Sequence, residues 1–239
     1  MEVFEKEGNL YTRTKDGKLM HVTLTPFTED EEKFSYRKYE EGTALYKEIE
    51  KINWKVKDSI FVPIGGQLTE FVVEHIRPGE KEQRDKVYFV SKKTCGTASM
   101  KNMHVKLASM AESMPMLLVD RMALIEHSIN PSFTSGNSGF PKRRVKISLL
   151  SLGNVDSSEK YSVMQNCCGC CGGDDIPFDG FREQVNRTKD MEYLLDTPVM
   201  YNPTEYCVVG RDGSTDGFGA SPDKEKGIVV CFAICKNKN

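Results

Sequence analysis

Short runs with a two-residue hydrophobic period dominate the chain, and this pattern predicts β-strands. Segments 60–62, 70–73 and 87–90 are β-branched or aromatic and lie between turn residues such as Gly65 and Gly66. Further strands are expected at 104–107, 145–150, 206–209 and 227–235. The residues between 210 and 223 are rich in Gly, Ser and Asp and are expected to form a loop.

An Asp-Gly turn predicts a β-hairpin near the N-terminus. Residues 10–14 and 19–24 flank Asp16 and Gly17, and the second segment alternates apolar and polar side chains.

Two segments carry the three- to four-residue period of an amphipathic helix. Thr28 and Glu31 have the spacing of a capping box, which predicts a helix that continues to about Lys51. Asp179 is the expected N-cap of a second helix over residues 180–195. Its apolar stripe is interpreted as core packing and comprises Phe178, Phe181, Val185, Met191, Leu194 and Leu195.

Many short strands with intervening helices favour one fold class. We expect a mainly β protein with two or three helices, an α+β chain whose single domain has a sandwich or jelly-roll-like core. No repeat or linker divides residues 1–239. The hairpin and first helix, residues 1–55, are expected to pack on a β core of residues 56–235.

Composition narrows the function classes. Thirty-three basic and 35 acidic residues give a net charge of −2, so bulk positive charge does not favour nucleic-acid binding. No stretch approaches the ~18 apolar residues of a transmembrane helix, and the charged N-terminus lacks the apolar region of a secretory signal. We therefore expect an intracellular protein that is not secreted, with mostly free thiols.

A cysteine- and glycine-rich segment is open to three interpretations. Cys167, Cys168, Cys170 and Cys171 form two overlapping C-x-x-C spacings, each of which supplies half a tetrahedral zinc site. Cys207, Cys231 or Cys235 could complete it, although no second C-x-x-C exists. Adjacent cysteines are also candidates for acylation, which would anchor the chain to a membrane. The third interpretation is a loop without a ligand, so zinc is the candidate metal and no cofactor is assigned.

Residues 136–141 resemble the Gly-Asn-Ser-Gly-x-Pro segment of trypsin-like serine proteases, with Ser138 in the place of the nucleophile. That chemistry requires an upstream histidine base. None of the upstream histidines stands in the Thr-Ala-x-His setting of that family; they are His21, His75, His104 and His127. We therefore expect a polar loop and no enzymatic activity, with a serine hydrolase as the least favoured alternative.

A basic cluster provides candidate phosphate contacts. Lys142, Arg143, Arg144 and Lys146 lie in and beside a predicted strand, and Phe140 before them could stack on a base. The same residues also suit a charged strand edge that discourages aggregation.

Three segments carry a resemblance to a known family. Residues 116–120 correspond to an apolar strand, residues 145–156 to an alternating strand with a Leu-Gly turn, and residues 229–235 to a last apolar strand. In these the chain resembles the thirty-kilodalton superfamily of plant-virus movement proteins, of the cucumovirus and umbravirus type. The hallmark aspartate of that family would fall near Ser151, so Asp120 and Asp156 are the candidates for its role.

The resemblance implies a non-enzymatic protein with a jelly-roll-like core. Such a protein binds single-stranded nucleic acid, associates with host membranes and carries viral genomes through plasmodesmata, and it would act in the host cytoplasm as a homo-oligomer. Residues 142–146 would then contact phosphates. The alternative is a viral structural or matrix-like β protein that assembles through protein contacts.

Overall fold

The structure is a computed structural model. It describes residues 3–6, 9–13, 19–22, 47, 49, 53–79, 85–128, 142–155, 176–199, 202–215 and 219–235. The chain divides into two compact units, Met1–Ser35 and Tyr36–Asn239, and each is described by itself. The packing of residues 1–55 on the β core stays a prediction.

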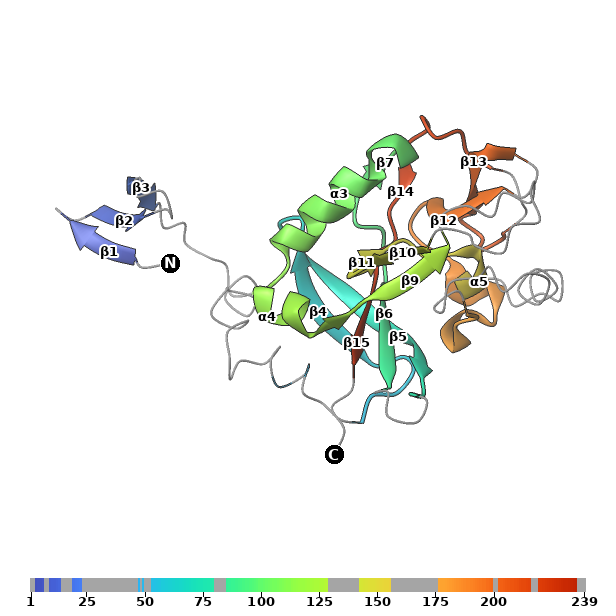
Figure 1. Cartoon of the computed structure of the whole chain (residues 1–239), viewed down its shortest axis with the longest axis horizontal. Helices are drawn as coiled ribbons and strands as arrows, with labels where there is room; N and C mark the ends of the chain where they lie inside the picture. Colours follow the sequence, from blue (N-terminus) through green and yellow to red (C-terminus); the bar gives the residue numbers. More distant parts are fainter. Residues whose placement is uncertain are drawn as a thin grey trace. The chain divides into compact units, whose positions relative to one another are not determined.

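The first unit contains a three-stranded antiparallel sheet in the order β1-β2-β3, drawn in blue in Figure 1. Its strands are β1 (Val3–Lys6), β2 (Asn9–Arg13) and β3 (Leu19–Val22). Leu10 lies opposite Val22 in the β2–β3 pair, which confirms the predicted hairpin. Most of the helix predicted up to Lys51 lies outside the described residues, although Lys47 and Ile49 are helical.

A six-stranded sheet is the centre of the second unit. Its main path runs β11-β15-β6-β5-β4 with antiparallel pairing, and β8 also pairs with β15. The strands are β4 (Ser59–Ile64), β5 (Gln67–Arg77), β6 (Lys86–Ser91), β8 (Met122–Ala123), β11 (Ile147–Ser148) and β15 (Cys231–Cys235).

The turn between β4 and β5 shows why the strands of this hairpin could be predicted from the sequence. Ile64 lies opposite Gln67, so Gly65 and Gly66 form a two-residue hairpin loop. Both have positive φ, +59° and +79°, as a type I′ turn requires and glycine permits without strain. The predicted strands at 60–62, 70–73 and 87–90 are confirmed as parts of β4, β5 and β6.

Two smaller groups of strands accompany this sheet. A four-stranded sheet has the order β13-β12-β14-β7, and β9 pairs with β10 in an antiparallel ribbon. The strands are β7 (Thr97–Ala98), β9 (Ile125–Ser128), β10 (Lys142–Val145), β12 (Tyr193–Val199), β13 (Asn202–Val209) and β14 (Lys226–Gly227). The predicted alternating strand at 145–150 is interrupted at Lys146, because β10 and β11 belong to different sheets.

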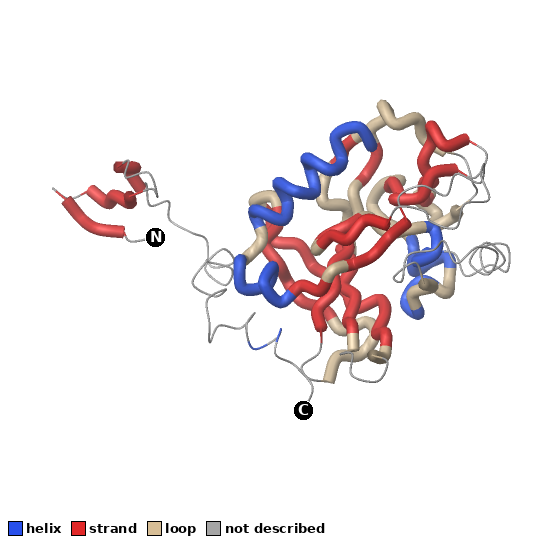
Figure 2. Tube along the Cα trace, in the orientation of Figure 1, coloured by secondary structure: helices blue, strands red, loops and turns tan. Residues whose placement is uncertain are grey.

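The described residues also contain short and long helices, shown in blue in Figure 2. They are α3 (Met100–Ser113), α4 (Met116–Arg121), α5 (Leu152–Val155) and the 3-10 helices η2 (Asp179–Phe181) and η3 (Gln184–Arg187). The strand predicted at 104–107 was wrong, because these residues belong to α3. Met103, Leu107 and Met110 are its buried face at steps of four and three.

The helix predicted over 180–195 was also wrong. Two 3-10 turns and the start of β12 occupy this segment. Asp179 does not cap a helix, because its carboxylate contacts His75 Nδ1 at 3.1 Å and Arg182 Nη2 at 2.5 Å. Val185, assigned to the apolar stripe, is 65% exposed.

The middle strands of the central sheet are buried on both faces. Phe89 of β6 joins a core with Phe71 and Phe232 on the side that α3 covers. Tyr88 and Val90, on either side of Phe89, point to the opposite face of the sheet, because successive strand residues alternate between faces. They join a second core that includes Phe178, Phe181 and residues of β12 and β13. The described residues thus confirm a mainly β, α+β fold with a sandwich-like arrangement (Figures 1 and 2).

Candidate functional site

The predicted phosphate-binding strand exists as β10, on the β9–β10 ribbon. The structure describes the backbone of Lys142 and Arg143 but not their side chains. Arg144 Nε donates to Glu126 Oε2 at 2.7 Å, and Lys146 Nζ donates to the carbonyl oxygen of Val119 at 2.6 Å. Both described basic side chains therefore have partners within the protein, which a phosphate would have to replace.

The structure describes some of the other candidates from the family resemblance. The apolar strand expected at 116–120 was wrong, because this segment is the helix α4. Asp120 is exposed on that helix, whereas Asp156 lies outside the described residues. Ser151, near which the hallmark aspartate would fall, is buried, and its hydroxyl group has no hydrogen-bond partner among the described residues.

The residues that carry the zinc and protease hypotheses lie outside the described part of the chain. Ser138 and the cysteine-rich segment lie outside the described residues; the four cysteines are Cys167, Cys168, Cys170 and Cys171. The described cysteines form no disulfide bond; they are Cys95, Cys207, Cys231 and Cys235. Burial raises the pKa of Cys207 to about 11, so this thiol stays protonated at neutral pH. Within the described ranges, no three His, Cys, Asp or Glu side chains form a group that could hold a metal ion.

A groove of about 520 Å³ lies where β4 ends the path of the central sheet. We call it the Phe61 groove, and it is lined by Phe61, Gln67, Leu68, Thr69, Glu70, Lys92, Lys93 and Thr94. Phe61 is 46% exposed, although Ile60 and Val62 on either side of it are fully buried. The alternation of β4 therefore places an aromatic ring on the outer face.

The strand register lines up three groups across this face. Phe61 lies opposite Glu70, whose carbonyl oxygen accepts a hydrogen bond from the backbone amide of Lys92 at 2.9 Å. Lys92 Nζ also contacts Glu70 Oε2 at 2.8 Å. An aromatic ring, a carboxylate and an ammonium group thus follow one another from β4 to the end of β6.

The segment that carries the lysines is fixed by Asp190. Its carboxylate accepts hydrogen bonds from the Thr94 amide at 2.9 Å and the Thr94 hydroxyl at 3.0 Å. Burial alone would raise the pKa of Asp190, but these hydrogen bonds and the charge of Lys93 together lower it. Asp190 therefore stays ionised and holds the segment in place.

Sequence reasoning missed this groove. The one signal was the run Ile60-Phe61-Val62, in which a strand period of two requires one apolar side chain to face outward.

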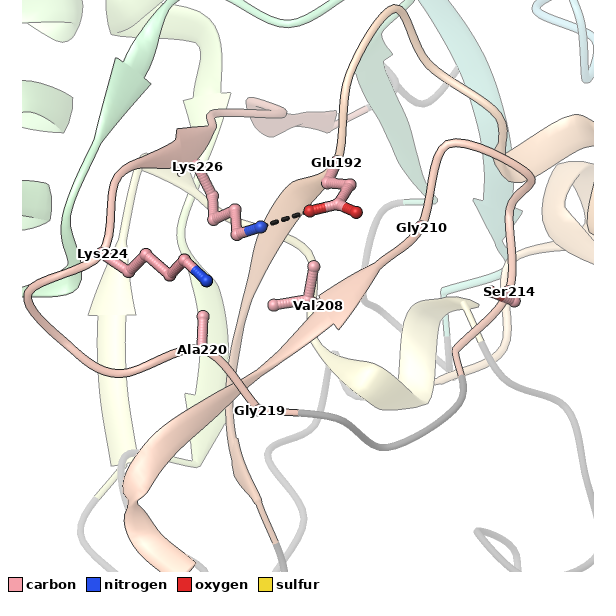
Figure 3. Close-up of a pocket in the computed structure, with 8 residues that line it drawn as sticks. All are labelled: Glu192, Val208, Gly210, Ser214, Gly219, Ala220, Lys224 and Lys226. Carbon is pink, nitrogen blue, oxygen red and sulfur yellow. Dashed lines mark hydrogen bonds and ion pairs between the residues drawn. The ribbon is translucent and has the colours of Figure 1, made fainter.

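A second pocket of about 350 Å³ lies beside the four-stranded sheet (Figure 3). We call it the β13–β14 pocket. The side chains of Glu192, Val208, Ala220, Lys224 and Lys226 contribute to its lining, together with Ser214 and two glycines. Lys226 Nζ donates a hydrogen bond to Glu192 Oε2, marked by the dashed line in Figure 3.

A buried ionic cluster ties residues 178–190 to the central sheet. Glu74 of β5 is buried, and its Oε2 contacts Lys57 Nζ at 2.7 Å. Lys57 Nζ also donates to the carbonyl oxygen of Gly180 at 3.1 Å, and Lys189 Nζ donates to the carbonyl oxygen of Ser91 at 3.0 Å. Burial raises the pKa of Glu74 and lowers that of Lys189 to about 8. We therefore assign the cluster a structural role, in which it holds residues 178–190 against the central sheet.

Among the described residues, no helix has the length and apolar character needed to cross a membrane. Comparisons with protein-family models, with curated proteins and with solved structures find no match to this chain.

Proposed function

We propose that this protein binds single-stranded nucleic acid without catalysing a reaction, and that the Phe61 groove is the place where it does so. The observation that carries the proposal is a half-exposed aromatic ring with two lysines in the same groove. Proteins that bind single strands combine aromatic rings, on which bases stack, with cationic groups that track the phosphates.

The groove supports this function better than the strand that carries Arg144. Arg144 and Lys146 are engaged with Glu126 and with a backbone carbonyl group. In the groove, Phe61 is 46% exposed. Lys92 is paired with Glu70 in the free protein, so a phosphate competes with one partly buried carboxylate for this exposed lysine. Lys93 is exposed and adds a second positive charge.

The resemblance to plant-virus movement proteins gives this proposal its biological setting. In that setting the protein coats single-stranded viral genomes as a homo-oligomer in the host cytoplasm. It associates with host membranes and carries the genomes through plasmodesmata.

The test is a titration of a fluorescent single-stranded oligonucleotide, followed by fluorescence anisotropy. Loss of base stacking in Phe61→Ala costs about 1–3 kcal/mol per stacked base, an affinity loss of roughly five- to 150-fold. Met116→Ala is the matched control, because Met116 is an exposed apolar side chain on α4, outside the groove. We expect this control to bind like the wild type.

Salt dependence separates phosphate contacts from other contributions. Two phosphate contacts give a slope of about −1.4 in log affinity against log salt, or a loss of roughly sevenfold between about 50 and 200 mM. Lys93→Gln should reduce that slope by about 0.7, while Lys106→Gln, an exposed lysine on α3, should leave it unchanged.

Two results would argue against the groove. If Arg144→Gln removes binding and Phe61→Ala does not, the nucleic acid lies on the β9–β10 ribbon instead. If folded protein at about 50 mM salt binds no oligonucleotide but forms concentration-dependent oligomers, the protein is the structural alternative that assembles through protein contacts.

A further inference from the structure

The walls of the β13–β14 pocket are held in place by backbone hydrogen bonds. Tyr206 and Ala220 exchange two of them, at 3.0 and 2.9 Å, which fix the segment around Ala220 beside β13. On the other side, the amide of Gly227 donates to the carbonyl oxygen of Glu192 at 2.9 Å and joins β14 to the start of β12. The side chains of Glu192 and Lys226 therefore project from fixed backbone.

Two lysines and one carboxylate are the charged groups among the described residues that line this pocket. The hydrogen bond and the charge of Lys226 lower the pKa of Glu192, and the charges of Arg211 and Lys224 add to this effect. Glu192 thus stays ionised and holds the Lys226 ammonium group at the wall. Among the residues that the structure describes, the Lys224 ammonium group has no hydrogen-bond partner. Figure 3 shows that it extends toward the same space as Lys226.

The remainder of the pocket is apolar or lacks side chains. Val208 and Ala220 offer carbon atoms to a ligand, and Gly210 and Gly219 line the pocket without a side chain. Ser214, whose hydroxyl group lies 2.7 Å from Asp212 Oδ1, adds a polar group at the rim. A volume of about 350 Å³ lies at the lower end of the range for small-molecule sites.

We propose that the β13–β14 pocket binds a small organic anion of about the size of a monosaccharide. Lys224 and Lys226 hold its carboxylate or phosphate group, and its carbon body lies over Val208 and Ala220. Glu192 is the only acidic side chain that lines the described part of the pocket. Because Glu192 already pairs with Lys226, it orients that lysine, and Lys224 supplies the uncompensated charge. This inference does not rest on nucleic-acid binding by the Phe61 groove.

The experiment is a titration of ¹⁵N-labelled full-length protein, followed through the amide resonances of Ser214 and Ala220. The probes are glucuronate, a sugar carboxylate, and ribose 5-phosphate, a sugar phosphate. Glucose and ribose are their neutral counterparts. We expect saturable shifts with at least one acid and none with the neutral sugars. The tighter of the two acids identifies a carboxylate or a phosphate as the recognised group.

Variants assign the binding to the lysines. Lys224→Gln should weaken the binding of the acid about tenfold, because it removes the exposed cation and leaves the pair of Lys226 and Glu192 intact. Lys106→Gln and Phe61→Ala should bind the acid like the wild type, which separates this site from the Phe61 groove. Equal shifts with the neutral sugars, unchanged affinity in Lys224→Gln, or no shifts with either acid would overturn the proposal.

Discussion

Replacement of Gly180 by alanine tests how residues 178–190 are fixed to the central sheet. A β-carbon at this position would lie 1.7 Å from Glu74 Oε2 and 2.8 Å from Glu74 Cδ. Both distances are far below a van der Waals contact, so the buried carboxylate of Glu74 has to move. That movement breaks its contact with Lys57 Nζ, which is 2.7 Å long in the native protein.

The expected cost follows from the lost interaction. A hydrogen bond to a charged group contributes about 1.5–3 kcal/mol, and Glu74 is buried while the side chain of Lys57 is half-exposed. We therefore expect Gly180→Ala to lower the free energy of unfolding by about 2 kcal/mol. In a Glu74→Ala background the clash with the carboxylate is absent, and only Lys57 Nζ, at the end of a half-exposed side chain, remains close at 3.0 Å. The same substitution should then cost less than about 0.5 kcal/mol.

The measurement is urea unfolding of the four proteins of this double-mutant cycle. Trp54, the single tryptophan, is buried and packs edge-on against Phe89 with ring centroids 5.0 Å apart, so its fluorescence reports unfolding. Gly66→Ala is the control, because its positive φ costs about 1–2 kcal/mol without any close contact. Gly66 lies about 25 Å along β5 from Glu74, so its cost should be the same in both backgrounds. If Gly180→Ala lowers the free energy of unfolding equally with and without Glu74, Gly180 does not lie against the Glu74 carboxylate.

Two further substitutions have calculable effects on stability. Because the pKa of Lys189 is about 8 in the folded protein and 10.5 ordinarily, the unfolded chain binds more protons between these values. Lys189 therefore makes stability rise with pH across that window, by at most about 3 kcal/mol. Urea unfolding of the wild type and of Lys189→Met at several pH values should show this rise in the difference between their free energies of unfolding, because the other titrating groups contribute equally to both proteins. A difference that does not change with pH would contradict it. Phe232→Ala should cost about 3–5 kcal/mol in the same assay, because the ring is fully buried between Phe71 and Phe89; a cost below 1 kcal/mol would show that the core lies elsewhere.

Local signals were sufficient where the chain forms hairpins. The alternation in β4 and β5 and the two glycines between them specify a hairpin without help from the rest of the protein. The error at 104–107 arose because four residues cannot distinguish a strand from a helix. The period that identifies α3 requires Met103, Leu107 and Met110 together.

Tertiary contacts decided the segment that was predicted as a second helix. Leu194 and Leu195 are both fully buried, each in a different core, which a strand between two layers permits. Asp179 has the residue type of an N-cap, but His75 and Arg182 take its carboxylate. Neither partner can be recognised as such from the sequence.

The candidate sites also depend on contacts that the sequence does not reveal, because strand register determines which side chains are neighbours. Phe61, Glu70 and Lys92 are neighbours only because β4, β5 and the end of β6 align in one way. The β13–β14 pocket likewise collects side chains that precede β12, lie on β13 and precede or lie on β14. None of these side chains was therefore predicted as a site residue from the sequence, because the sheets determine which of them meet.

The most direct test of nucleic-acid binding at the Phe61 groove is a gain of affinity. Glu70→Gln keeps the shape of the side chain but removes the carboxylate that pairs with Lys92. We predict that this variant binds a single-stranded oligonucleotide several-fold more tightly than the wild type at about 50 mM salt, and with a steeper salt dependence. Unchanged or weaker binding by the folded variant would contradict it.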